Sequence, residues 1–408
     1  MISFGVFETF GAGLLILGFG YLLSKLRIFS VLCLPAAVLG GVFALSVLVF
    51  FSHFFELKIS FDESPKESLL LAFFASLGLG IDFSKKSNFS KNFFIFLGLC
   101  AFIMVLQNLL GITIISLFDK QKELGLIAGS ISLSGSFGMG AFWSEVLKTE
   151  PYNITNALDI SIACATFGVL FGSVLGAPLG AFLIEKFVLK KENSRFESKE
   201  KSPSQKELGK ENNLNKALVL FFSKKELKNT IISVLLLAFC VLCASVVKLF
   251  ISLPAIIFAL IFAFMLRVLC YFFGLNLAQK NLALLGNFCL ALFLALALIS
   301  IDLKALLDIG LPLFVLLCLE LVLMLFFVFF ITFRVFGRDY EAALLSVAQC
   351  GLCLGATPIA LANLEKLELR FFSSKSALAI LCLSGVFFID FINVLVIWLF
   401  LSFLWVFY

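Results

Sequence analysis

Long apolar runs follow one another along almost the whole chain, separated by short polar segments. They lie at 7–23, 34–51, 69–81, 93–117, 124–146 and 157–183 in the first half, and at 231–250, 254–273, 282–301, 311–333, 342–364 and 377–407 in the second. As helices, most of these runs could cross the roughly 30 Å hydrocarbon layer of a membrane. The pattern predicts an all-α polytopic membrane protein.

Three segments of the first half recur in the second half in the same order. Residues 34–45 recur as 253–264, 73–82 as 293–302, and 135–141 as 350–356, at offsets of 219, 220 and 215. A duplication of this kind in a membrane protein typically places two halves around a central binding site. The repeat therefore indicates a transporter.

Between the halves lies a polar stretch rich in Lys, Glu, Ser and Asn, which cannot bury a core and reads as a loop. The predicted organisation is a first repeat over 1–184, a linker loop over 185–229 and a second repeat over 230–408.

The fifth run of each half is unusual, because glycine and serine cluster in its middle. The first reads GSISLSGSFGMGAFW and the second reads SVAQCGLCLGATPIALAN. One interpretation is an ordinary spanning helix with small residues at a packing interface. The other is a re-entrant hairpin, which enters and leaves the membrane on one side with its irregular tip buried in protein.

Basic residues favour the hairpins. With five spans and one hairpin in each half, 24 of the 31 lysines and arginines fall on the side of the linker, against 20 if the fifth runs are full spans. Basic loops face the cytoplasm. We therefore expect two repeats of inverted topology, a cytoplasmic linker, and both termini on the outer side of the membrane.

The hairpin tips are the candidate substrate site. Helices that end at a glycine-rich tip direct unpaired N–H groups and a positive dipole end at an anion. The candidate substrate-binding residues are Ser134, Gly135, Ser136 and Gly138 at the first tip, and Gln349, Cys350, Gly351, Thr357 and Asn363 at the second.

Ionisable groups inside apolar runs are functional candidates by default. Asp390 lies in the last run with Asn393 three residues on, and such oxygens suit a hard cation. Ser132 and Thr166 add hydroxyl groups, which completes the candidate sodium set. Glu320 and the pair Gln107-Asn108 occupy comparable places in the two repeats. These residues could equally bind an ion or substrate or form hydrogen bonds between helices.

Other classes of protein find little support. The 11 cysteines are scattered through apolar runs and the chain has a single histidine, so neither a disulfide framework nor a histidine metal site is indicated. No nucleotide-binding loop, nucleophile elbow or zinc-protease helix occurs, so we expect neither an enzyme nor a nucleotide-driven pump.

The N-terminal run lacks a basic region and a cleavage site, so it reads as a first span. Nothing suggests nucleic-acid binding.

The motifs resemble the bacterial sodium/glutamate symporters. The resemblance rests on LLLAFFASLGLGID, MVLQNLLGI, GLIAGSISLSGSFGMGAFW, ACATFGVLFG, LFLALALI and FFIDFINVLVI, and it covers nearly the whole chain outside the linker. It implies ten spans plus two re-entrant hairpins, a homodimer in the inner membrane, and an elevator-type movement of a transport domain. It also implies sodium-coupled uptake of L-glutamate, with sodium as the co-transported ion.

The first tip departs from the family pattern. Relatives commonly read Ser-Gly-Gly-His-Gly-Thr-Gly where this chain has Ser134-Gly135-Ser136-Phe137-Gly138-Met139-Gly140. Symport of another dicarboxylate or hydroxycarboxylate is therefore the alternative. A channel is compatible with the repeat, although no ring of charges lines the tips.

Overall fold

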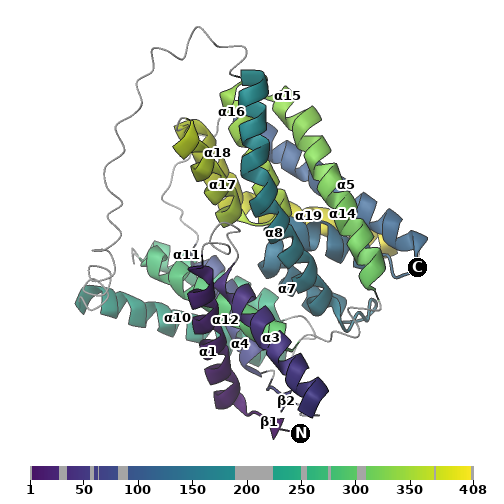
Figure 1. The fold of residues 1–408 in the computed structure, drawn as a ribbon. Coiled ribbons are helices and arrows are strands. Elements are labelled where there is room, and N and C mark those ends of the chain that lie inside the picture. Colours follow the sequence, from purple (N-terminus) through teal and green to yellow (C-terminus); the bar gives the residue numbers. More distant parts are fainter. Residues whose placement is uncertain are drawn as a thin grey trace. The chain divides into compact units, whose positions relative to one another are not determined.

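The computed structural model describes residues 2–26, 35–55, 59–62, 64–80, 91–188, 224–249, 255–273, 277–300, 309–371 and 374–405. Within these ranges the chain is almost entirely helical (Figure 1). The exception is a pair of two-residue parallel strands, β1 (Ile2–Ser3) and β2 (Ile59–Ser60). Most of the predicted linker, 189–223, lies outside the described residues.

Among the described residues, seven helices are long and apolar enough to cross a membrane. They are Val6–Ser24, Lys91–Leu117, Ala157–Phe187, Lys228–Lys248, Ala255–Phe272, Gln279–Ile299 and Gly310–Val335. Shorter apolar helices cover Ala36–Phe51, Tyr340–Leu354 and Ile389–Leu404. The prediction of an all-helical, multi-pass membrane protein is confirmed at this level.

The chain forms two compact units, and each takes helices from both halves of the sequence. Unit 1 contains α1 (Val6–Ser24), α3 (Ala36–Phe55), α4 (Ser64–Leu79), α10 (Lys224–Lys248), α11 (Ala255–Phe272) and α12 (Gln279–Ile299). The repeat boundaries near residues 184 and 230 concern an internal symmetry and stay a prediction.

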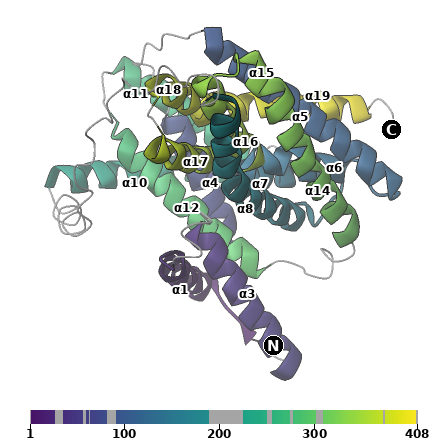
Figure 2. The ribbon, with the colours of Figure 1, turned by 45° about the horizontal axis from the view of Figure 1, so that its top comes forward.

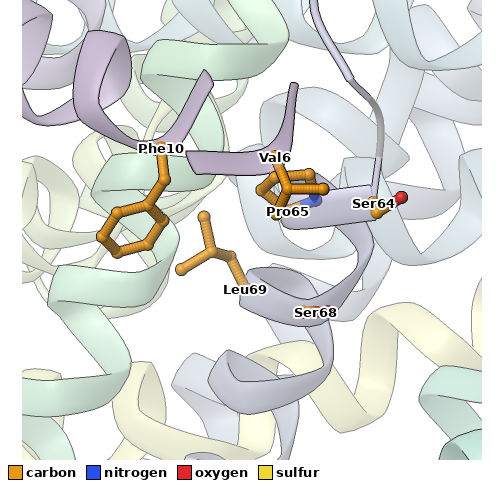
Figure 3. A pocket seen from close by; sticks show the side chains of 6 residues that line it. All are labelled: Val6, Phe10, Ser64, Pro65, Ser68 and Leu69. Carbon is orange, nitrogen blue, oxygen red and sulfur yellow. The ribbon is translucent and has the colours of Figure 1, made fainter. Parts of the chain in front are cut away.

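Helix α4 is the centre of unit 1, where it packs against α10, α11 and α12. Helix α12 also packs against α3. Beside α4 lies an apolar hollow of about 290 Å³ lined by Val6, Phe10, Ser64, Pro65, Ser68 and Leu69 (Figure 3). Among the described residues that line it, the polar side chains are two serines, which offer little chemistry for binding a charged ligand.

Unit 2 contains the remaining helices, several of which include a wider π-helical turn. Its first-half elements are α5 (Lys91–Leu117), α6 (Glu123–Leu126), η1 (Ile127–Ile131), α7 (Ser136–Leu147), α8 (Ala157–Leu183) and η2 (Ile184–Val188). Its second-half elements are α14 (Gly310–Phe327), η4 (Val328–Thr332), α15 (Phe333–Val335), α16 (Tyr340–Leu354), α17 (Thr357–Arg370), α18 (Lys375–Leu383), η5 (Ser384–Phe388) and α19 (Ile389–Trp405).

Helix α8 is the helix of unit 2 along which both broken segments pack. Helices α7, α16 and α17 all pack along it (Figure 2). The apolar core of this unit is large and contains fully buried aromatic side chains such as Phe93, Phe96 and Phe327. Within that core lie fully buried polar side chains, and these mark the candidate site.

Candidate functional site

Two helical segments of unit 2 are broken in the middle. The first passes through α6 and η1, breaks at Ser134-Gly135 and continues as α7. Its backbone is irregular at Gly129, and Ser136 has a left-handed φ of 54°. The second runs through α16, breaks at Gly355-Ala356 and continues as α17, with a proline at the start of α17. Proline is tolerated there because the first N–H groups of a helix have no partner within it.

The first segment folds back along α5. Gly111 and Gly125 bring the backbones of α5 and α6 into direct contact. Further along, the Ser130 amide donates to Asn108 Oδ1 (3.0 Å), and the Ser134 hydroxyl donates to Gln107 Oε1 (2.8 Å). Residue numbers rise on one helix as they fall on the other, so the two run antiparallel. Because Gln107 lies near the middle of α5, the first break lies beside the middle of that helix.

Both ends of the first segment lie at the same end of the unit. Its two arms pack against each other, because α7 contacts η1. Burial, together with the negative charge of Glu123 at the start of α6, also raises the pKa of the Tyr152 phenol just after α7. The segment therefore makes a hairpin. We call residues 123–147 the first hairpin.

The second segment makes a hairpin along α8. Val347 of α16 and Leu367 of α17 both contact Gly180 near the end of α8, whereas Leu354 contacts Gly168 near its middle. The chain thus travels inward from the C-terminal end of α8 and returns to it. We call residues 340–370 the second hairpin.

The two breaks meet beside Gly168. Leu133 of the first hairpin and the Leu354 carbonyl of the second both contact this glycine. Gln107 Nε2 donates to the Cys353 carbonyl (3.0 Å), and the Ser134 hydroxyl lies 3.4 Å from the same oxygen. The first hairpin approaches from the N-terminal end of α8, where Gly140 contacts Ser161. The hairpins therefore approach from opposite ends of α8.

We call the place beside Gly168 where the two breaks meet the junction. Two helices also start there. Helices α7 and α17 begin at the breaks, and in the described structure neither N-cap residue, Gly135 or Ala356, supplies a side-chain hydrogen bond. The amide groups at a helix start carry a partial positive charge and attract anions. Two uncapped helix starts at one junction could thus receive carboxylate groups.

The predicted substrate residues fall into two groups. Ser134, Gly135 and Ser136 lie at the first break, and Thr357 lies at the second, where its hydroxyl donates to the Gly385 carbonyl (2.8 Å). The remaining residues lie on the helix arms. Gly138 belongs to α7, Gln349, Cys350 and Gly351 to α16, and Asn363 to α17.

The arm residues have local packing roles. Gln349 Oε1 accepts a hydrogen bond from Thr332 (2.5 Å), and Asn363 Nδ2 donates to the Gly172 carbonyl (2.8 Å). Gly351 allows α16 to contact Ala360 of α17, and Cys350 is fully buried. The structure therefore does not bring all nine residues together.

The predicted sodium residues are also dispersed. Asn393 Nδ2 donates to the Ser130 carbonyl (2.9 Å), which links α19 to the first hairpin. Ser132 shares a hydrogen bond with Ser161 (2.8 Å). The Thr166 hydroxyl donates to the Ile162 carbonyl of its own helix (2.7 Å), and Asp390 lies half-buried in the first turn of α19.

Some junction residues fall outside the predicted site. Gln107 binds both hairpins, through Ser134 and the Cys353 carbonyl, and Asn108 binds the first hairpin through the Ser130 amide. Two adjacent amides in an apolar run were a visible signal. A backbone carbonyl gives no signal in a sequence.

The breaks are also displaced within the repeated motif. In 135–141 the break lies at the start of the motif, whereas in 350–356 it lies at the end. The sequence pairs Gly135 with Cys350, whereas the helices break at Gly135 and at Gly355. Similar small residues align well by composition, whereas the breaks depend on backbone geometry at Ser136 and Gly355.

Several buried polar atoms near the junction have no hydrogen-bond partner among the described residues. They include Asn108 Nδ2, Ser130 Oγ, Asn363 Oδ1 and Asn393 Oδ1. Buried polar groups are normally paired, so each such atom requires an explanation. Neutral oxygens of this kind suit a hard cation such as sodium.

Comparison with known proteins identifies one family. The family model described as "Sodium/glutamate symporter" matches residues 2–373. The chain is 32% identical over 395 residues to a sodium/glutamate symporter of Haemophilus influenzae, covering 96% of each protein. It is also 32% identical over 374 residues to one of Escherichia coli, covering 90% of each. No solved structure matches the chain. The chain belongs to the sodium/glutamate symporter family.

Proposed function

We propose that this protein takes up L-glutamate together with sodium across the bacterial inner membrane. Membership of the family makes the chain a transporter and not an enzyme. The observation that carries the proposal is the junction, where two uncapped helix starts meet among buried hydroxyl, amide and carbonyl groups. Glutamate has two carboxylate groups, and one helix start is available for each.

The proposed topology has ten spans and two re-entrant hairpins. The spans are the seven long apolar helices together with α3, α4 and the α18–α19 helix. The first and second hairpins enter from opposite faces, which makes the repeats inverted. The linker is cytoplasmic and both termini are periplasmic, as the distribution of basic residues favours.

The proposed mechanism is an elevator, in which a transport domain moves against a scaffold within a homodimer. Two compact units in one chain support this division. Unit 2 holds the junction and is the proposed transport domain. Unit 1 exposes many large apolar side chains on α1, α3 and α10, which suits contact with lipid or with a second copy.

The proposed ligands at the junction follow from the predicted residues. Ser134, Gly135, Ser136 and Thr357 lie at the breaks, where substrate carboxylates would meet the helix starts. Gly138, Gln349, Cys350, Gly351 and Asn363 form the surrounding arms. Asp390 and Asn393 on α19, with Ser132 and Thr166, are the proposed sodium ligands.

The test is uptake of labelled glutamate into proteoliposomes. We expect uptake that needs an inward sodium gradient and stops when choline replaces sodium. Equal rates of glutamate uptake with and without the sodium gradient would refute the coupling to sodium. A competition panel of dicarboxylates and hydroxycarboxylates decides the substrate, because Phe137 and Met139 depart from the first-tip pattern that the family resemblance implies. Stronger competition by another acid than by glutamate would favour that acid.

A further inference from the structure

One fully buried carboxyl group lies in the core of unit 2. Glu320 of α14 is 0% exposed, and neither of its carboxyl oxygens has a hydrogen-bond partner among the described residues. It belongs to the inward stripe of α14, between Leu317 and Met324. Intramembrane carboxyl groups are costly and persist where they bind a cation or a proton.

The neighbours of Glu320 can be derived from helix directions. Helix α5 leads into the first hairpin and α14 leads into the second, and these begin at opposite ends of α8, so α5 and α14 run antiparallel. The rings of Phe102 and Phe327 lie 5.7 Å apart across this pair. Glu320 is two turns before Phe327, which brings it level with the region just after Gln107 on α5.

Helix α14 also packs against η1, the π-helical turn that contains Ser130. Helix α19, which carries Asn393, packs against the same turn. Asn393 Nδ2 donates to the Ser130 carbonyl, whereas Asn393 Oδ1 and Ser130 Oγ have no hydrogen-bond partner within the described ranges. The Glu320 carboxyl group lies on α14, Asn393 Oδ1 on α19 and Ser130 Oγ on η1, and both α14 and α19 pack against η1. All three side chains are fully buried. Single-turn π-helical elements are frequent at functional sites.

We propose that Glu320 supplies the carboxylate of a sodium site at η1, with Ser130 Oγ and Asn393 Oδ1 as its neutral ligands. The inference rests on the proposed sodium symport and adds an acidic ligand from α14. A bound sodium ion would neutralise Glu320 and join α14 to the first hairpin. Since Ser134 and Cys353 link that hairpin to the second, sodium would also stabilise the junction that receives the substrate.

The test is the sodium dependence of glutamate uptake by Glu320→Gln in proteoliposomes. Glutamine keeps the shape and removes the charge, so we expect the sodium concentration for half-maximal uptake to rise by about tenfold or more. The matched control is Glu341→Gln. Glu341 also has a carboxyl oxygen without a hydrogen-bond partner in the part of the chain that the structure describes, but it lies in the first turn of α16, far from the second break. We expect its sodium dependence to match that of the unaltered protein.

A second variant keeps the inference testable if Glu320→Gln fails to fold. Ser130→Ala removes one neutral ligand, and we expect a several-fold weaker response to sodium, also visible as a smaller rise in melting temperature when sodium replaces choline. Unchanged sodium dependence in Glu320→Gln, or in Ser130→Ala where only that variant folds, would overturn the site. Absence of sodium stimulation in the unaltered protein would instead refute the proposed symport.

Discussion

At the scale of single residues, Ser134 is the side chain that joins the two hairpins most directly. Its hydroxyl donates to Gln107 Oε1 and lies near the Cys353 carbonyl. Ser134→Ala removes this link, and a typical hydrogen bond contributes about 1 kcal/mol. We expect the glutamate concentration for half-maximal uptake to rise by about two- to tenfold. Initial uptake rates over a glutamate series would measure it.

Ser144→Ala is the matched control for Ser134→Ala. Ser144 is a buried serine of the same hairpin, but its hydroxyl donates to the Gly140 carbonyl of its own helix (2.6 Å). We expect a near-normal glutamate response. Equal effects of the two substitutions would show that the link between the hairpins does not matter for binding.

Asp390 permits a separate test of the predicted sodium set. It is half-buried at the start of α19, one turn before Asn393. If Asp390 is a sodium ligand, Asp390→Asn removes the charge and should raise the sodium requirement several-fold. The maximal rate at saturating sodium should recover. A sodium titration of uptake measures both quantities, and an unchanged titration curve would remove Asp390 from the set.

The sequence could predict some of these residues because their chemistry is unusual for an apolar run. Ser134 stood in a cluster of glycine and serine, and Asn393 stood three residues from an aspartate. The roles of Gln107 and Cys353 could not be derived in this way. Gln107 acts because antiparallel packing brings it level with the first break, and Cys353 acts through its backbone carbonyl.

At the scale of helices, the close contact at Gly168 controls how the hairpins meet. A methyl group at this position would overlap the Leu354 carbonyl and crowd Leu133. Overpacking of this kind typically costs about 1–3 kcal/mol. We therefore expect Gly168→Ala to lower the melting temperature and to abolish most of the uptake. A thermal unfolding scan in detergent would measure the melting temperature, and an uptake assay in proteoliposomes would measure the loss of transport.

Gly172→Ala is the matched control on the same helix. A methyl group there would lie 3.4 Å from the Leu354 side chain, which is an ordinary contact distance. The control should keep normal stability and uptake. If it were as damaging as Gly168→Ala, the loss would reflect a general intolerance of α8 to larger residues.

The hydrophobic pattern located the helices well, because burial in a membrane requires long apolar runs. The run predicted over 124–146 corresponds to helices between 123 and 147, and the run over 342–364 lies within 340–370. The position of each break was harder to predict. Small residues are spread over both motifs, whereas the turn depends on the backbone conformation of a few of them.

At the scale of the whole molecule, the two compact units cut across the two sequence repeats. The repeat is visible in the sequence because three segments of the first half recur in the second half. The units are not visible there, because they depend on which helices pack together after folding. Helix α4 packs with α10, α11 and α12 from the other half, and α8 packs with α16 and α17. The proposed elevator mechanism needs a division of the chain into two bodies of this kind.

The opposite approach of the two hairpins predicts opposite exposure of their outer ends. The loop after the first hairpin, near Thr149, should face the periplasm, and the end of the second hairpin, near Phe371, should face the cytoplasm. Short epitopes inserted after each residue can be probed with antibody in intact spheroplasts and after permeabilisation. We expect the epitope after Thr149 to be labelled in both conditions and the epitope after Phe371 only after permeabilisation. Equal labelling of both in intact spheroplasts would mean that both hairpins open to one face, which is incompatible with inverted repeats.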